Sequence, residues 1–366
     1  MPVAAELSVF IAAAAVSLGA SYILVTRLER IGERLGLSEG LLGVLAALAG
    51  DAPEITSAVT ALSMHQNNVG AGVVIGSNVF NLAALLGLGA VVAGRIALHR
   101  KVILLGGVVG AWIAVVCLVT VLGLIPAGAA LVAALAALIP YLIVLGAGRA
   151  RLARIPLTRR WEAWLATAVS EEEAELEEVI HPPHGRGRDV ALAGAMLIIV
   201  VAASVAMEQA ATRLGTHFSI PPIIIGGVVL AAVTSLPNSV AAVYLAARGR
   251  GAAMLSTTLN SNALNVTAGL LVPATITGLG APSGQADLIA LWYLVLTLIA
   301  LAFAYRDSGM TRATGAFIIG AYLVFLGSLW IVARSAEPGL AGSVVPLAVV
   351  VACSGAGLAG RRRRLR

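Results

Sequence analysis

Two stretches of this chain, residues 43–94 and 227–278, are copies of one hydrophobic unit. A shift of 184 positions without a gap pairs Gly43 with Gly227, Pro53 with Pro237, Ser77 with Ser261, Asn78 with Asn262, Asn81 with Asn265 and Gly94 with Gly278. In each copy a proline and several polar residues interrupt an apolar run. A duplicated membrane unit with polar, helix-breaking centres is typical of a transporter whose ion site lies between its repeats.

The apolar stretches in and around the copies are long enough to cross a membrane. Hydrophobic residues make up 59% of the chain and charged residues 11%, which excludes an ordinary soluble domain. A helix needs about 20 residues to cross a hydrocarbon core of ~30 Å. We therefore predict an all-α polytopic membrane protein with eleven spans, near 5–25, 39–63, 69–93, 102–122, 126–147, 189–209, 222–246, 252–278, 287–305, 313–333 and 341–359.

The positive charges give the predicted topology. With the N-terminus outside, 22 of the 24 Lys and Arg fall in inside loops, and only Arg213 and Arg334 lie outside. This split follows the positive-inside rule. The sequence therefore predicts an integral protein of the cytoplasmic (inner) membrane with a cytoplasmic C-terminus. The net charge of +6 is then explained by the membrane topology. The expected partner is the lipid bilayer, and nucleic-acid binding is not expected.

Each copy falls within a group of five predicted spans. Because five is odd, the second group enters the membrane in the opposite orientation, so the repeat is inverted. We predict a first half over 1–148, a cytoplasmic loop over 149–188, a second half over 189–334, and an extra helix with a basic tail over 335–366. The loop contains a run of glutamates and a His-Pro-Pro-His segment. A solvated linker is the simpler interpretation of it, and a cation sensor lying on lipid is the alternative.

The acidic residues Asp51 and Glu54 interrupt the first copy, where the second copy has Ser235 and Asn238. Away from the ends of the predicted spans, no other carboxylate occurs in the membrane. An ionised carboxylate in mid-bilayer costs about 2.5–3.5 kcal/mol on insertion scales, so such a residue indicates function. Asp51 and Glu54 are three residues apart and share a helix face. A protonated pair that only joins helices is the structural alternative.

Hydroxyl and amide side chains follow in the next predicted span. Ser77 and Asn81 are four residues apart and face the same way, whereas Asn78 lies about 100° round the helix, where the expected roles are to cap a helix or to bridge to a neighbour. The second copy repeats this arrangement over residues 260–265. Carboxylate, amide and hydroxyl oxygens are the ligands that hard cations such as Na⁺ and Ca²⁺ prefer.

These motifs resemble the α-repeats of the cation/calcium antiporter superfamily, the sodium/calcium exchangers and their relatives. That family pairs a Gly-Thr-Ser-Leu-Pro-Glu motif with a Gly-Ser-Asn-(Ile/Val)-x-(Asn/Asp) motif in each repeat. Here the counterparts of the first motif are Gly50-Asp51-Ala52-Pro53-Glu54 and Thr234-Ser235-Leu236-Pro237-Asn238. The counterparts of the second motif are residues 76–81 and 260–265.

The resemblance implies a secondary antiporter that works by alternating access and is not an enzyme. It binds its transported cations transiently, without a cofactor, and no nucleotide-binding loop indicates ATP use. The cation ligands that it implies in this chain are Glu54, Asp51, Ser77, Asn81, Asn238, Ser261, Asn265 and Thr234.

Departures from the family pattern leave the cargo open. A Ca²⁺ site in this family has two opposed glutamates, one from each repeat, but Asn238 replaces the second one here. If Asp51 points into the site, the charge is −2, which balances one Ca²⁺ or two monovalent ions. If it points away, a single Na⁺ or H⁺ is the natural cargo, and a Na⁺/H⁺ antiporter on the same fold becomes the alternative.

More remote alternatives are a cation channel, a relative that only senses ions, and an intramembrane aspartyl protease. A protease of that kind needs two aspartates from different helices. Asp189 and Asp287 lie at ends of predicted helices, and Asp307 lies in a predicted loop. Asp51 therefore has no partner for such chemistry.

Overall fold

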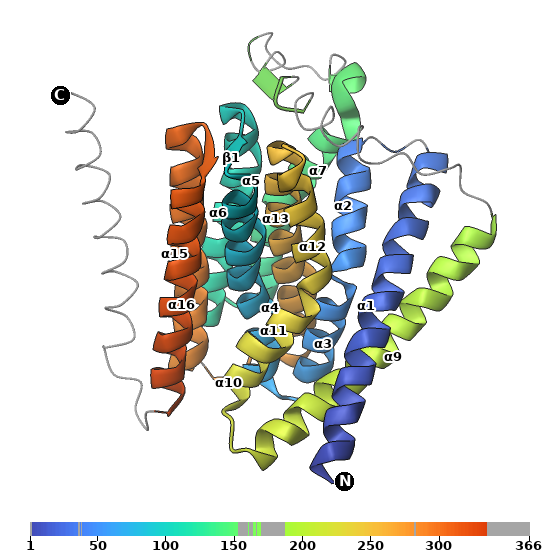
Figure 1. Ribbon diagram of the computed structural model, residues 1–366, viewed down its shortest axis with the longest axis vertical. Coiled ribbons are helices and arrows are strands. Elements are labelled where there is room, and N and C mark those ends of the chain that lie inside the picture. The colour runs from blue at the N-terminus through green and yellow to red at the C-terminus, as the bar shows by residue number, and fades with distance from the viewer. Residues whose placement is uncertain are drawn as a thin grey trace, which may run out of the picture.

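The computed structural model describes residues 2–152 (except 36 and 38), 187–281 and 283–334, with a few positions between 160 and 169. These residues are almost entirely helical, and most of the helices run along one direction in a single bundle (Figure 1). Seven of the described helices are long and apolar enough to cross a membrane, or eight if one bent pair is a single span. The predicted all-α fold is confirmed, and the number of eleven spans stays a prediction.

Helices occupy all ten predicted spans that fall within the described residues. Four of these spans are single helices close to the predicted bounds: α6 (Arg100–Val121), α7 (Ala127–Leu152), α15 (Gly284–Asp307) and α16 (Arg312–Arg334). The predicted eleventh span at 341–359, the basic tail and most of the loop at 149–188 lie outside the described residues.

Two helices at one edge of the bundle are longer than predicted (Figure 1). α1 (Val3–Arg34) and α9 (Gly187–His217) continue well past residues 25 and 209. They pack against each other in antiparallel fashion. Polar contacts join them near both ends and in the middle: Arg213 Nη1 to Glu6 Oε1 at 3.2 Å, Ser17 Oγ to Ser204 Oγ at 2.9 Å, and Arg27 Nη1 to Asp189 Oδ1 at 2.9 Å. Because the charges pair with one another, both helices continue through residues that hydropathy alone places at their ends.

The first copy of the repeat folds as α2 (Glu39–Gly50), α3 (Ala52–Ser63), α4 (Asn67–Asn81), the π-helical segment η1 (Leu82–Leu88) and α5 (Gly89–Ala93). The junction between α2 and α3 follows from Pro53, which has no N–H to donate to the carbonyl of Ala49. That carbonyl accepts a hydrogen bond from Ser21 Oγ of α1 instead, at 3.0 Å.

The second copy folds as α10 (Pro222–Ile224), η2 (Ile225–Leu230), α11 (Ala231–Thr234), α12 (Leu236–Ala247), α13 (Gly251–Leu264), η3 (Asn265–Leu271) and α14 (Val272–Thr277). Its path bends by 50° between α11 and α12, where Pro237 occupies the first turn. The π-helical segments η1 and η3 occupy matching places, next to Asn81 and Asn265. Such segments are rare and often mark functional sites.

A short antiparallel sheet joins the two halves at one end of the bundle. β1 (Arg95–Ala97) pairs with β2 (Gly309–Thr311), and the facing residues Ile96 and Met310 are both buried. The sequence predicted no strand there. We call this end the basic face, because the arginines gathered there are Arg27, Arg30, Arg95, Arg100, Arg248, Arg250, Arg306 and Arg312. The chain begins at the opposite end, the N-terminal face (Figure 1).

Candidate functional site

The two acidic residues of the first copy lie inside the bundle. Asp51 sits at the junction of α2 and α3, Glu54 lies in the first turn of α3, and both side chains are fully buried. Within the described part of the chain, no third His, Cys, Asp or Glu joins them in a group. The site therefore has two carboxylates and otherwise neutral polar neighbours.

The side chain of Asp51 points toward the second copy. Its Oδ1 atom accepts hydrogen bonds from Asn238 Nδ2 of α12 at 2.5 Å and from Ser261 Oγ of α13 at 2.7 Å. Its Oδ2 atom is buried and has no hydrogen-bond partner. The sequence left open whether the side chain of Asp51 points into the site or away from it. In the structure it points into the site.

Glu54 points the same way and is held by two different donors. Its Oε1 atom accepts from Ser235 Oγ at 2.5 Å, and its Oε2 atom accepts from the amide of Asn265. The 184-residue shift of the repeat relates Asp51 to Ser235 and Glu54 to Asn238. The Asp51–Asn238 contact and the Ser235–Glu54 contact are therefore equivalent by the symmetry of the repeat. Each acidic residue therefore contacts the motif of the opposite copy.

Four asparagines extend this symmetry across the contact between α4 and α13. Asn78 Nδ2 donates to Asn262 O at 3.0 Å, and Asn262 Nδ2 donates to Asn78 O at 3.2 Å. Asn81 Nδ2 donates to Asn262 Oδ1 at 3.1 Å, and Asn265 Nδ2 donates to Asn78 Oδ1 at 3.3 Å. The bridging position expected for Asn78 is thus found, and a pseudo-two-fold axis passes between Asn78 and Asn262.

Three buried oxygens at the site accept no hydrogen bond: Asp51 Oδ2, Asn81 Oδ1 and Asn265 Oδ1. Buried polar atoms in proteins are rarely left without a partner, so a group of them needs an explanation. All three are acceptors, and one is a carboxylate oxygen. A hard cation requires such atoms, so the residues present fit a cation.

Two of the expected ligands direct their hydroxyl protons elsewhere. Ser77 donates to Val73 O at 2.7 Å, and Thr234 donates to Leu230 O at 2.9 Å, each within its own helix. Both side chains are fully buried. The Ser77 hydroxyl nevertheless lies within hydrogen-bonding reach of Glu54, whereas no hydrogen bond joins Thr234 to either carboxylate. The other expected residues do form one network, in which Asn81 is linked to Asp51 through Ser261, at 3.2 Å from Asn81 Nδ2 to Ser261 Oγ.

Sequence reasoning missed two polar residues. Ser235 binds Glu54 but was not among the expected ligands, although its place opposite Asp51 in the repeat was a usable signal. Glu208 was placed at the end of the predicted span 189–209 and was therefore set aside. α9 continues to His217, so Glu208 lies inside this helix and is fully buried.

Gly50 explains why the first copy lacks the threonine found in the second. A Cβ atom at this position would overlap Oδ1 of Asn238. The missing side chain therefore leaves room for Asn238 beside Asp51. The changes at positions 50, 51 and 238 are parts of one arrangement.

A cavity approaches the site from one face, although Asp51 and Glu54 themselves are fully buried and do not line it. A cavity of about 340 Å³ extends from Gly50 and Asn238 to Glu29 and Tyr244, on the side of the basic face. Toward the N-terminal face, glycines bring α4 and η2 into backbone contact. A Cβ at Gly72, for example, would lie 2.8 Å from Gly227 N.

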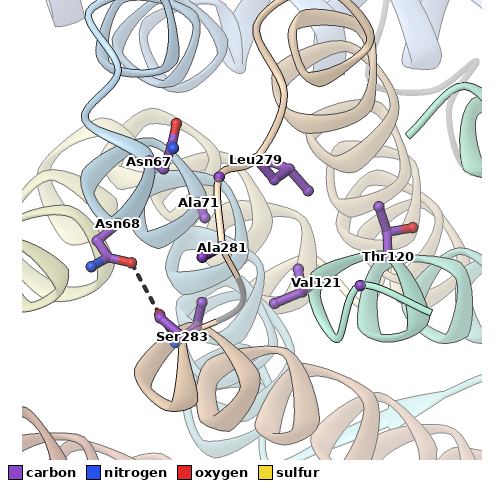
Figure 2. Close-up of a pocket in the computed structure, with 11 residues that line it drawn as sticks. Asn67, Asn68, Ala71, Thr120, Val121, Leu279, Ala281 and Ser283 are labelled. Carbon is purple, nitrogen blue, oxygen red and sulfur yellow. Dashed lines mark hydrogen bonds between the residues drawn. The ribbon is translucent and has the colours of Figure 1, made fainter. Parts of the chain in front are cut away.

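A second, much smaller cavity of about 40 Å³ lies at the N-terminal face (Figure 2). It is lined by the start of α4, the end of α6 and the segment before α15, and Asn68 Oδ1 accepts a hydrogen bond from Ser283 Oγ at 3.0 Å across it. Neither the two carboxylates nor any of their hydrogen-bond partners lines this cavity, so it is separate from the candidate cation site.

Inverted helical repeats that enclose a buried acidic and amide-rich centre define a class of membrane transport proteins. The sodium/calcium exchanger protein family matches this chain twice, over residues 6–147 and 190–331. The two matches start 184 positions apart, as the motifs do. The chain therefore belongs to the sodium/calcium exchanger family, and it is an integral membrane protein.

Among known proteins, inner membrane protein YrbG of Escherichia coli (strain K12) is 26% identical over 287 residues, which are 76% of this chain and 82% of that protein. Sodium/potassium/calcium exchanger 3 of Rattus norvegicus is 38% identical over 73 residues, which are 20% of this chain and only 12% of the exchanger. This chain thus matches a small part of the length of that relative.

Solved structures share the fold. The H⁺/Ca²⁺ exchanger CAX superimposes with a TM-score of 0.66 at 14% identity, over 98% of this chain and 88% of that one. The sodium-calcium exchanger NCX_Mj superimposes with a TM-score of 0.51 at 20% identity, over 89% of this chain and 99% of that one.

Proposed function

We propose that this protein is a secondary antiporter that moves Ca²⁺ across the membrane in exchange for Na⁺ or H⁺. The observation that carries the proposal is the pair of buried carboxylates, Asp51 and Glu54, together with three buried oxygens that have no donor. Both carboxylates face the opposite repeat, so an ionised site has a formal charge of −2. One Ca²⁺, or two monovalent cations, balances this charge.

The same charge gives a physical reason for exchange. Two unbalanced carboxylates in the membrane interior are costly, at about 2.5–3.5 kcal/mol each on insertion scales. A carrier that has released its cargo therefore changes its direction of access at low cost only when other cations replace that cargo. Two protons or two sodium ions restore neutrality as one Ca²⁺ does, and this requirement links the two flows.

The two sides of the site differ, as alternating access requires: one side has a cavity and the other is closed by helix packing. The cavity of about 340 Å³ leads to the basic face, which the positive-inside rule assigns to the cytoplasm. The glycine contact between α4 and η2 separates the site from the N-terminal face. We infer an inward-facing state, with the carboxylates still covered, of an inner-membrane protein with an outside N-terminus; the similarity to the inner membrane protein of Escherichia coli supports this location.

A monovalent cation/proton antiporter is the second candidate. Asn238 and Asn265 stand where many family members have acidic residues, which lowers the negative charge that the second repeat contributes. The inward direction of Asp51 offsets part of this loss, and for this reason we favour Ca²⁺.

Uptake of ⁴⁵Ca²⁺ into proteoliposomes tests the proposal. Vesicles are loaded with Na⁺ at equal pH, or with acid at equal Na⁺, so that each outward gradient acts alone. We expect saturable uptake under one gradient and none without a gradient, and the gradient that drives it identifies the coupling ion.

The isosteric variant Glu54→Gln should abolish this uptake, because it removes one of the two charges. Asp307→Asn is the matched control, since Asp307 pairs with Arg306 on the basic face, away from the site. Uptake that persists in Glu54→Gln would remove the carboxylate pair as the cation site. Uptake without any counter-ion would indicate a channel.

A further inference from the structure

Glu208 is a further buried acidic side chain within a candidate membrane span. It lies within α9 and is fully buried. Its Oε1 atom lies 3.1 Å from Thr212 Oγ1, and its Oε2 atom has no hydrogen-bond partner. A buried carboxylate without compensation is costly, so it holds a proton or contacts a cation.

The nearest arginine along α9 does not neutralise this carboxylate. Arg213 is paired with Glu6 of α1, at 3.2 Å between Arg213 Nη1 and Glu6 Oε1. Among the described residues, Glu208 forms no ion pair. It is therefore not part of the charge contacts that join α1 to α9.

The hydroxyl of Thr212 lies next to Glu208 and links it to a further oxygen. Thr212 Oγ1 also lies 3.4 Å from Oε1 of Gln66, which belongs to the connection between α3 and α4. A hydroxyl group has one proton, so Thr212 can donate to Glu208 or to Gln66 but not to both. The cluster thus brings a carboxylate, a hydroxyl and a side-chain amide together between α9 and the repeat.

Two members of this cluster border a cavity at the N-terminal face, whereas Glu208 lies behind them, fully buried, and does not line it. Gln66 and Thr212 line a cavity of about 420 Å³ together with Asn67, Asn68 and Ser283. The last three residues also line the small cavity of Figure 2, so the two cavities adjoin. The cavity beside the candidate cation site at Asp51 and Glu54 lies on the opposite side, toward the basic face.

We propose that Glu208, Thr212 and Gln66 form a second cation site, which binds one Na⁺ entering from the N-terminal face. A single carboxylate with two neutral oxygens matches the charge of a monovalent cation, and water from the cavity can complete its coordination. The proposal rests on the proposed antiport function. In this proposal an entering Na⁺ occupies the second site while the cavity beside Asp51 and Glu54 faces the opposite side of the membrane.

Equilibrium binding of ²²Na⁺ to the full-length protein in detergent tests the second site. Wild type, Glu208→Gln, Glu54→Gln and the double variant are compared at one pH. We expect Glu208→Gln to lose one bound Na⁺ per chain and to retain the ions that depend on Glu54. Glu54→Gln should retain the Na⁺ that depends on Glu208, and the double variant should bind none.

Thr212→Val is a second probe, because it removes one oxygen and preserves the shape of the side chain. The loss of one such interaction should weaken the second site about tenfold. Thr216→Val is the matched control, one turn further along α9 at an exposed position. Size-exclusion chromatography shows whether each variant is folded.

The outcomes separate this proposal from the antiport function. Equal Na⁺ stoichiometry in wild type and Glu208→Gln would overturn the second site, and Glu208 would then hold a proton. If Glu54→Gln alone leaves Na⁺ binding and ⁴⁵Ca²⁺ uptake unchanged, the proposed antiport site fails instead.

Discussion

The substitution Asp51→Asn tests how the charge of the site selects its cargo. It removes one of two negative charges with little change in shape. The new side chain can still accept from Asn238 and Ser261, which now donate to Asp51 at 2.5 and 2.7 Å. The expected effect is therefore electrostatic, and the fold should be retained.

Its magnitude follows from the burial of the site. Removal of one partner from a buried, hydrogen-bonded charge pair costs about 2–5 kcal/mol. We take about 2 kcal/mol for a monovalent cation at Asp51. Coulomb energy scales with the charge of the cation, so the loss for Ca²⁺ should be about 4 kcal/mol. The affinity for Na⁺ should fall about 30-fold and that for Ca²⁺ about a thousandfold.

Competition binding with ²²Na⁺ and ⁴⁵Ca²⁺ measures both affinities on the same sample. Asp307→Asn has the same change in chemistry at the basic face and should leave both unchanged. If Asp51→Asn weakened Ca²⁺ and Na⁺ equally, Asp51 would act on the shape of the site. No effect on either ion would show that Asp51 is not a ligand.

Three further predictions concern the packing and the charge of the site. Gly50→Ala should displace the amide beside Asp51 and lower ⁴⁵Ca²⁺ uptake about 10- to 100-fold, because a hydrogen bond to a charged group contributes about 1.5–3 kcal/mol. Gly76→Ala should overpack the backbone contact of α4 with η2 and destabilise the fold by about 1–3 kcal/mol, seen as a lower unfolding temperature. For both, Gly19→Ala is the control, since no atom lies within 4 Å of its Cβ. Asp51→Ser should lose Ca²⁺ binding, and adding Asn238→Glu should restore it; a double variant no better than the single one would show that the two positions do not share a site.

The predictable part of this fold comes from patterns that repeat along the chain. Apolar runs marked ten helical stretches, and the 184-residue offset related the two halves. The breaks at Gly50–Pro53 and near Pro237 could be predicted because proline removes a backbone donor in any context. Positions of Asn78 and Asn81 on one helix were enough to separate a bridging residue from a site residue.

Features that depend on partners from distant segments could not be predicted. The span predicted from hydropathy ends near residue 209, because the charged residues Glu208 and Arg213 lie at or just beyond that point. The helix α9 of the structure continues past them. In the structure Arg213 pairs with Glu6 and Glu208 is buried. In the same way, the spacing of Asp51 and Glu54 showed that they share a face, but not that this face meets α12 and α13.

The repeat is symmetric in its contacts and asymmetric in its charge. Each carboxylate accepts a hydrogen bond from the residue of the other copy that corresponds to its acidic neighbour, yet both carboxylates belong to the first copy, Asp51 directly before α3 and Glu54 in its first turn. Their separation is therefore set within one copy and not by the distance between the repeats. In the family pattern of opposed glutamates, a movement of one repeat against the other changes the spacing of the charges. In this chain such a movement changes only the neutral donors around them, so the charge offered to a cation should stay nearly constant while access to the site changes.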